Sequence, residues 1–149
     1  DPTIELAMRD LVVGAERDGH ANDVLDALAH KLGAEGVDVV YDIVQSRGGS
    51  KAAEHAVSLL REPDVIKKAS PALRIAFELR EAPCEQKAAL LDRAVKEGDA
   101  RALGVMRTLA SSCLRHNKAL GRAMLDLAVR LEAESPHEVA PPRRAHPKR

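Results

Sequence analysis

The chain has 149 residues, about one domain and enough to enclose a hydrophobic core. Hydrophobic residues make up 45% of it and charged residues 31%, a composition that excludes wholesale disorder. The formal net charge is zero, and the sequence has one Tyr, one Phe and no Trp. Balanced charge and the lack of stacking residues argue against a nucleic-acid partner and against a carbohydrate site.

Apolar residues in the first part of the chain recur at helical spacing. They predict amphipathic helices over residues 4–15 and 25–32. Residues 37–44 have the same period, and we predict a helix there, although their β-branched content leaves a strand as the alternative. Ser50 follows two glycines and is expected to cap a helix over residues 51–60.

Proline and cap residues mark the helices of the second part. Pro63 and Asp64 open a short helical turn, and Ser70 followed by Pro71 predicts a strong helix start. The helix after Pro71 is apolar around most of its circumference, so we expect it to be the most buried of the fold. Further helices are expected over 83–97, 99–109 and 116–131. The last one places Arg130 on its solvent face, with Arg122 and Asp126.

Short connections between these helices imply antiparallel neighbours. We therefore predict an all-α fold of antiparallel helical hairpins, either a HEAT-like α-solenoid or an irregular helical bundle. Helix starts expected at Ser50, Pro83 and His116 are 33 residues apart, which favours stacked hairpins. The predicted organisation is a helical-repeat domain over residues 1–134 and a tail over 135–149.

The tail is rich in proline and carries Arg143, Arg144, Lys148 and Arg149 against Glu138, a net charge of +3. Proline discourages helix and sheet, and the charges have little apolar neighbourhood to bury, so this segment is expected to be disordered. The four cations are the candidate partner-binding residues, because exposed positive charge attracts an acidic partner through a screened field.

Two stretches resemble the inner helix of HEAT-like repeats. They are Pro63-Asp64-Val65-Ile66-Lys67-Lys68-Ala69 followed by Ala72-Leu73, and Gly98-Asp99-Ala100-Arg101-Ala102-Leu103. The block from residue 64 to 103 is also similar to helical regions appended to multidomain bacterial signalling proteins, some with Ser/Thr-kinase domains. This resemblance implies a binding or scaffolding role, with a regulatory segment of a kinase-type protein as an alternative.

A phosphate site is the first chemical alternative. Residues 37–44 as a strand, then Gly48-Gly49-Ser50-Lys51 opening a helix, would give the order strand, glycine loop, helix of a P-loop. A P-loop requires a glycine five residues before the Gly-Lys pair and a Ser or Thr directly after the lysine. In this sequence the first glycine is missing and Ser50 precedes Lys51. A helix–helix turn with a serine cap is the preferred interpretation.

A metal or nucleophile site is the second. Cys113 and His116 have the spacing of half a zinc site, and Cys84 is a conceivable third ligand, but a structural site needs four.

Two cysteines are too few for a disulfide framework, so a reducing, cytoplasmic compartment is the default. No apolar run approaches the length of a membrane span. The first residue is Asp1, so we expect a fragment or a processed form.

The sequence thus predicts a noncatalytic protein–protein interaction or scaffold module with no cofactor. Its partner is expected to be another protein or another part of its own chain, recognised by a groove between stacked hairpins.

Overall fold

The structure, a computed structural model, describes residues 2–17 and 19–135. Every regular element within these ranges is helical and none is a strand, which confirms the all-α prediction. A short 3-10 segment, Ala88–Leu90, joins α7 to α8. The α-helices are α1 (Pro2–Arg17), α2 (Ala21–Lys31), α3 (Ala34–Ser46), α4 (Lys51–Leu60), α5 (Pro63–Ile66), α6 (Pro71–Glu81), α7 (Cys84–Lys87), α8 (Leu91–Glu97), α9 (Ala100–Ala110) and α10 (Lys118–Glu134).

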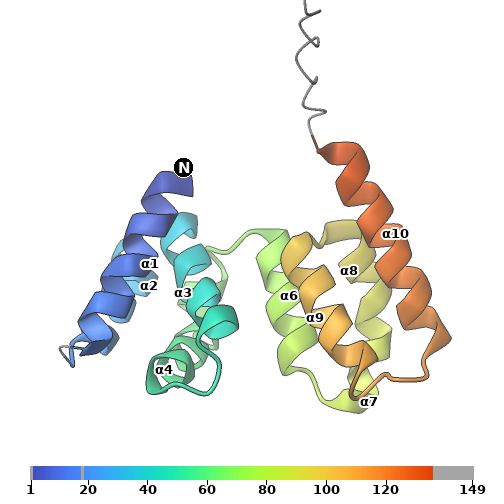
Figure 1. Ribbon diagram of the computed structural model, residues 1–149, viewed down its shortest axis with the longest axis horizontal. Helices are drawn as coiled ribbons and strands as arrows, with labels where there is room; N and C mark the ends of the chain where they lie inside the picture. The colour runs from blue at the N-terminus through green and yellow to red at the C-terminus, as the bar shows by residue number, and fades with distance from the viewer. Residues whose placement is uncertain (1, 18, 136–149) are drawn as a thin grey trace, which may run out of the picture.

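The helices form an elongated array with two groups (Figure 1). The N-terminal group contains α1 to α4, and the C-terminal group contains α6 to α10. Helices α3 and α6 face each other where the groups meet, whereas α1 and α10 lie at opposite ends (Figure 1). The buried side chains of both groups belong to one continuous hydrophobic cluster, so the two groups share a core.

The cap residues lie where the sequence predicted them. The hydroxyls of Ser50 and Ser70 each accept a hydrogen bond from the backbone N–H three residues on, at 3.1 Å. The Asp99 carboxylate accepts one from the N–H of Arg101 at 2.9 Å. The last helix begins at Lys118 behind an Asn117 cap, slightly later than the predicted start at His116. Each cap satisfies an N–H that a helix start leaves without an intrahelical partner.

Helix α3 is the most buried element, and the prediction that α6 would be is wrong. Seven residues of α3 are buried: Gly36, Val37, Val39, Val40, Tyr41, Ile43 and Val44. Five are buried in α6: Leu73, Ile75, Ala76, Phe77 and Leu79. Helix α3 packs against α1, α2 and α4 and also faces α6, whereas α6 has a polar face that its neighbours leave uncovered. Residues 37–44 are helical, as preferred from the sequence.

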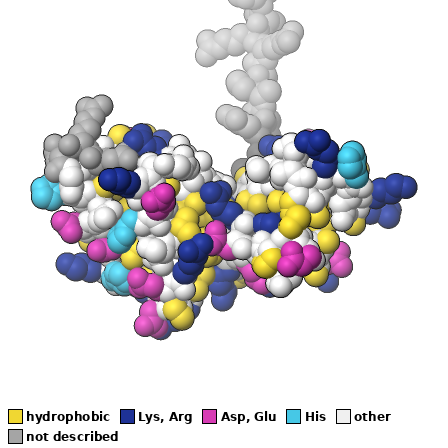
Figure 2. Space-filling model, turned by 90° about the horizontal axis from the view of Figure 1, so that it is seen from below, with side chains coloured by type: hydrophobic (Ala, Val, Ile, Leu, Met, Phe, Trp, Pro, Cys, Tyr) yellow, Lys and Arg dark blue, Asp and Glu magenta, His cyan; other side chains and the backbone are white. Residues whose placement is uncertain are grey.

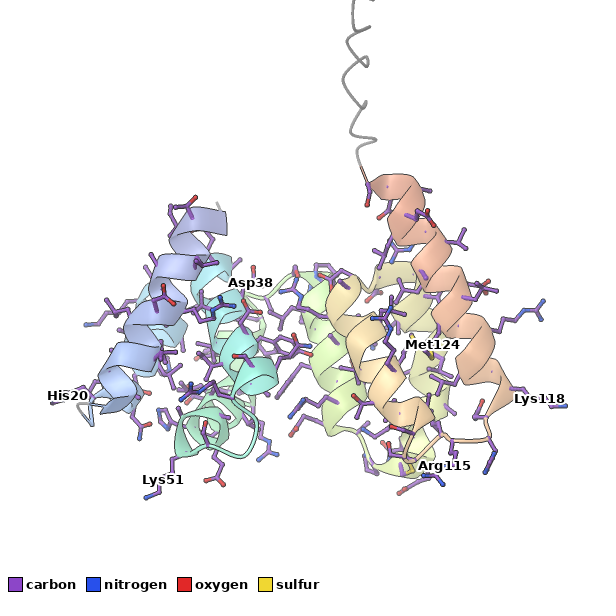
Figure 3. The ribbon with its side chains drawn as sticks, viewed as in Figure 1. His20, Asp38, Lys51, Arg115, Lys118 and Met124 are labelled. Atoms are coloured by element: carbon purple, nitrogen blue, oxygen red, sulfur yellow. A yellow bond between two sulfur atoms is a disulfide. The ribbon has the colours of Figure 1, made fainter. Side chains whose placement is uncertain are left out.

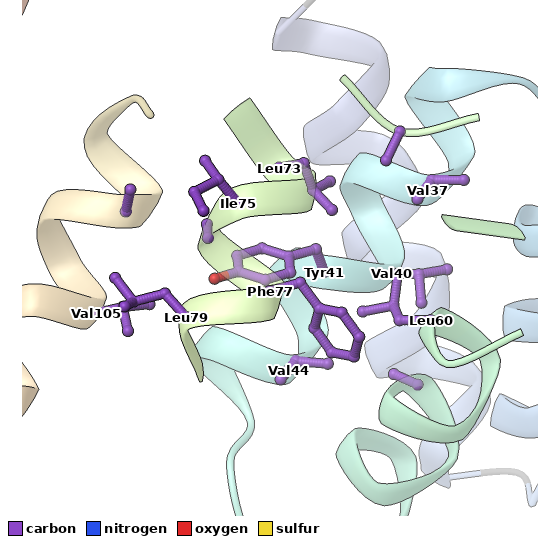
Figure 4. Close-up of a cluster of buried hydrophobic side chains, with 14 of the residues drawn as sticks. Val37, Val40, Tyr41, Val44, Leu60, Leu73, Ile75, Phe77, Leu79 and Val105 are labelled. Atoms are coloured by element: carbon purple, nitrogen blue, oxygen red, sulfur yellow. The ribbon is translucent and has the colours of Figure 1, made fainter. Parts of the chain in front are cut away.

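The single Tyr and the single Phe fill the space between the two groups. The Tyr41 side chain projects from α3 toward α6, with its hydroxyl pointing to the side of Ile75 and Val105 (Figure 4). The ring of Phe77 lies beside Val44 and Leu60 (Figure 4). Tyr41 is completely buried and Phe77 is 7% exposed. The two rings thus contribute their large apolar surfaces to the contact between the groups.

Two long cations bind the carbonyl ends of helices. The ammonium of Lys87 donates to the carbonyl oxygens of Leu79 and Arg80 at 2.7 and 2.6 Å, and burial lowers its pKa. Arg130 donates from Nε to the carbonyl oxygen of Val95 at 2.9 Å and from Nη2 to that of Gly98. The prediction that Arg130 faces solvent is therefore wrong, because its guanidinium satisfies carbonyls that the end of α8 leaves free.

Candidate functional site

A groove with a volume of about 800 Å³ runs along the exposed face of α6, and we call it the α6 groove. Helix α6 contributes the central part of the lining. The C-terminal ends of α4 and α5 line one side of the groove, and α7 and α8 line the other. The residues that line it are Leu60, Arg61, Ile66, Pro71, Arg74, Phe77, Glu78, Glu81, Ala82, Gln86, Leu90, Arg93 and Glu97.

The base of the α6 groove is apolar and continuous with the core. Phe77 and Leu60 belong to the buried cluster, and Ile66 and Leu90 are half-buried side chains packed against it. An apolar side chain placed in the groove would therefore cover carbon surface that is partly hydrated in the free protein.

Ion pairs fix the two carboxylates that α6 contributes. Glu81 accepts a hydrogen bond from Nε of Arg61, at the end of α4, at 2.8 Å. The carboxylate of Glu78 lies 2.6 Å from Nη2 of Arg93 on α8. Nε of the same arginine donates to the carboxylate of Glu97 at 3.2 Å. These pairs are partly exposed, so each adds little stability, but together they hold α6 to the elements on both sides of the groove.

Arg74 differs from the other arginines of the groove. Its side chain is exposed and has no hydrogen bond or ion pair within the described ranges, whereas Arg61 and Arg93 are both bound to glutamates. A free guanidinium next to an apolar surface is suited to bind a carboxylate. The face shown in Figure 2 likewise has hydrophobic side chains lying directly beside Lys, Arg, Asp and Glu.

A second polar cluster lies where the helix groups meet. Arg101 on α9 donates to Asp38 on α3 at 2.7 Å and to Asp99 at 2.7 Å. Burial opposes the charge of Arg101, but its bonds to Asp99 and Asp38 outweigh that and raise its pKa. Asp38 lies on the part of α3 nearest the C-terminal group (Figure 3). This cluster ties the two groups together and leaves no guanidinium nitrogen of Arg101 without a carboxylate.

The Tyr41 hydroxyl is close to this cluster and is buried without a hydrogen-bond partner in the part of the chain that the structure describes. Burial raises the pKa of Tyr41 to about 12. A neutral phenol buried in this way has a packing role.

The arrangements that the two chemical alternatives require are not formed by the described residues. The Gly48–Lys51 loop connects two helices, because residues 37–46 belong to α3 and not to a strand, and Ser50 caps α4. Cys84 and Cys113 are joined in a disulfide, so their sulfurs are not available as thiolate ligands. No group of residues within the described ranges, His116 included, has the arrangement of a metal site.

The sequence did not reveal this disulfide, and the expectation of free thiols is wrong. Cys84 begins α7 and Cys113 lies in the loop after α9, 29 residues later. Pairing across that separation depends on how α6, α7 and α9 pack, and no spacing rule encodes it.

The residues predicted to bind a partner, Arg143, Arg144, Lys148 and Arg149, lie outside the described residues. Sequence reasoning also missed Arg74. The available signal was its spacing of three residues from Pro71 and three from Phe77, which places all three on the side of α6 that lines the groove.

None of the described helices is long and apolar enough to cross a membrane. No known protein family, curated protein or solved structure compared with the chain matches it.

Proposed function

We propose that this protein is a noncatalytic helical module that binds a segment of another protein in the α6 groove. The observation that supports the proposal is the combination of an apolar base with Arg74, a cation that has no ion pair with any described residue. The segment best suited to the groove carries apolar side chains for the surface around Phe77 and one carboxylate for Arg74.

The apolar base and Arg74 are expected to contribute very different amounts to the free energy of binding. Apolar burial provides most of the free energy of binding, at about 25 cal/mol per Å² removed from water. An exposed arginine–carboxylate pair adds only about 1 kcal/mol, or roughly fivefold in affinity. Arg74 therefore selects among apolar segments more than it holds them.

The lining of the groove also favours binding over catalysis. It contains no histidine, cysteine or hydroxyl side chain, and its carboxylates on α6 are bonded to arginines. A HEAT-like repeat architecture and a place as a regulatory segment of a kinase-type protein stay predictions.

A cytoplasmic location is also kept as a prediction, and the Cys84–Cys113 disulfide is the observation against it. Disulfides persist in oxidising compartments and are rare in the cytosol. Alkylating the protein under denaturing conditions directly after cell lysis, with mass measurement, shows which redox state the cell maintains.

The groove is tested by selecting displayed random peptides of 12 to 16 residues on the wild-type protein. Enriched peptides are expected to combine apolar residues with Asp or Glu, and to bind Arg74→Glu several-fold more weakly. The matched control is Arg107→Glu, which reverses an exposed arginine on α9 outside the groove. Peptides that bind both variants as well as the wild type would contradict the proposal, as would a selection that enriches none.

A further inference from the structure

The large hydrophobic side chains exposed in the described residues gather at the two ends of the array. They are Ile4, Leu6, Leu11, Leu32, Leu125 and Val129, with exposed fractions of 45%, 55%, 60%, 38%, 64% and 58%. The first three lie on α1, Leu32 follows α2, and the last two lie on α10. In helical arrays the outer faces of terminal helices are normally polar, because nothing covers them. Apolar residues at both ends therefore indicate that something does.

The surface at the α1 end, which we call the α1 strip, is an apolar groove with one anion beside it. Ile4, Ala7 and Leu11 follow one another at three- and four-residue spacing along α1, and with Met8 and Leu28 they line a hollow of about 370 Å³. Ala7 leaves the middle of this strip shallow. Asp10 is exposed beside it and has no ion pair among the described residues.

The surface at the opposite end, which we call the α10 strip, is an apolar ridge with cations. Leu125 and Val129 are one turn apart on the outer side of α10, and Lys118 and Arg122 precede them on that side at helical spacing. Both cations are exposed and unpaired within the described ranges. The α10 strip thus presents two exposed apolar side chains for the hollow of the α1 strip and positive charge for its Asp10 carboxylate.

We infer that the α10 strip of one copy of this chain docks on the α1 strip of a second copy, head to tail. In an antiparallel register Arg122 lies opposite Asp10, Leu125 opposite the shallow position at Ala7, and Val129 opposite Ile4. The first step is three residues on both helices, and the second is four residues on α10 and three on α1. Each step is close to one helical turn, so the three contacts lie along one side of each helix and form together.

The direction of the two helices within one molecule agrees with this register. The N-terminus is at the upper end of α1 in Figure 1, whereas Lys118, which begins α10, is at the lower end of the molecule in Figure 3. The helices therefore run in opposite directions. A second copy placed beyond α10 in the same orientation presents α1 antiparallel to it, and the array of helices continues across the contact.

Such a contact is heterologous, because the two surfaces that meet are different. The resulting dimer keeps a free α1 strip on one copy and a free α10 strip on the other, so the association is open-ended. The strips are small, so we expect dissociation constants between about 10 µM and 1 mM. The contact between Arg122 and Asp10 is exposed, so added salt weakens it.

The test is sedimentation equilibrium of the full chain between about 10 µM and 1 mM, a range set by those constants. The wild type is expected to show a mean mass that rises with concentration through dimer and beyond. Two variants each remove one strip: Ile4→Glu with Leu11→Glu for α1, and Leu125→Glu with Val129→Glu for α10. Each alone is expected to stay monomeric, whereas their equimolar mixture forms a dimer and nothing larger, since one intact strip of each kind remains.

Controls separate this contact from other causes. Lys51→Glu, on an exposed position of α4, is expected to associate like the wild type, and circular dichroism confirms that each variant keeps its helices. Asp10→Arg and Arg122→Asp are each expected to associate about tenfold more weakly, and a mixture of the two to recover through the swapped pair. A wild type that is monomeric at 1 mM overturns the inference. The inference is also overturned if the α1 variant is monomeric while the α10 variant still associates, and if mixing the two variants does not restore association of the α1 variant. That result indicates a symmetric dimer in which the α1 strips of two copies meet.

Discussion

Replacing Gly36 by alanine is predicted to destabilise the protein, against the usual preference of helices for alanine. Gly36 is in the first turn of α3, where α3 approaches α2 at backbone distance. A Cβ atom added there would lie 2.1 Å from the carbonyl oxygen of Leu28 and 2.7 Å from Cβ of Leu32. Neither atom is the end of a flexible side chain, so relief requires the two helices to move apart.

Two opposing effects set the magnitude. Alanine is favoured over glycine within a helix by about 1 kcal/mol. Forcing an extra carbon into a packed contact costs about 1–3 kcal/mol, and the backbone overlap at Gly36 places it in the upper part of that range. We therefore expect the free energy of unfolding to fall by about 1–2 kcal/mol in Gly36→Ala.

The assay is urea unfolding followed by circular dichroism at 222 nm, with Gly121→Ala as the matched control. Gly121 is also near the start of its helix, α10, but an added Cβ would meet nothing within 4 Å. The control is expected to be about 0.5–1 kcal/mol more stable than the wild type. A Gly36→Ala protein as stable as the wild type, or more so, would refute the reasoning that α2 and α3 are in backbone contact at this point.

Four further predictions also concern stability, three of them tested by urea unfolding and the fourth by thermal melts. Reducing the Cys84–Cys113 disulfide, or replacing both cysteines by serine, is expected to lower the free energy of unfolding by about 3–4 kcal/mol. The reason is that the unfolded chain is no longer cross-linked between residues 29 positions apart and gains conformational entropy. A urea midpoint that does not change when reductant is added would contradict this prediction. Tyr41→Phe is expected to be neutral or up to about 1 kcal/mol stabilising, since the buried hydroxyl has no hydrogen-bond partner among the described residues. A clear loss of stability would reveal one. Phe77→Ala is expected to cost about 3–5 kcal/mol through the cavity it leaves, whereas a loss under about 1 kcal/mol would mean that the ring is not packed in the core. The hydrogen bond between His30 and Glu62 raises the pKa of His30. The stabilisation of the folded protein by this contact is therefore complete below the ordinary pKa of about 6.5 and is lost as the pH rises through the higher pKa of the folded state. Thermal melts in which the stability of His30→Gln depends on pH as that of the wild type does would contradict this prediction.

The sequence by itself determined where most of the helices lie, although the single helix expected over 83–97 is divided into α7, a 3-10 segment and α8. The apolar period placed α2, α3, α4 and α6 correctly, even where the valines of α3 left a strand possible. Ser50, Ser70 and Asp99 cap helices as predicted, because a cap is a local bond between a side chain and an N–H two or three residues away. Information of this kind lies entirely within a short stretch of chain.

Burial was only partly predictable. Leu73, Ala76, Phe77 and Leu79 are buried as expected. Leu11, in contrast, belongs to the predicted apolar face of α1 and is 60% exposed. The period of a helix shows which residues share a face, but it does not show whether another element covers that face.

Only the tertiary structure decided which distant residues meet. Asp38 binds Arg101 across 63 positions, and Cys84 joins Cys113 across 29. The same packing pairs Arg61 and Arg93 with glutamates, whereas no carboxylate within residues 2–17 and 19–135 binds Arg74. These outcomes depend on the relative placement of whole helices, which is set by the fit of many side chains at once, and a single segment of sequence carries no record of that fit.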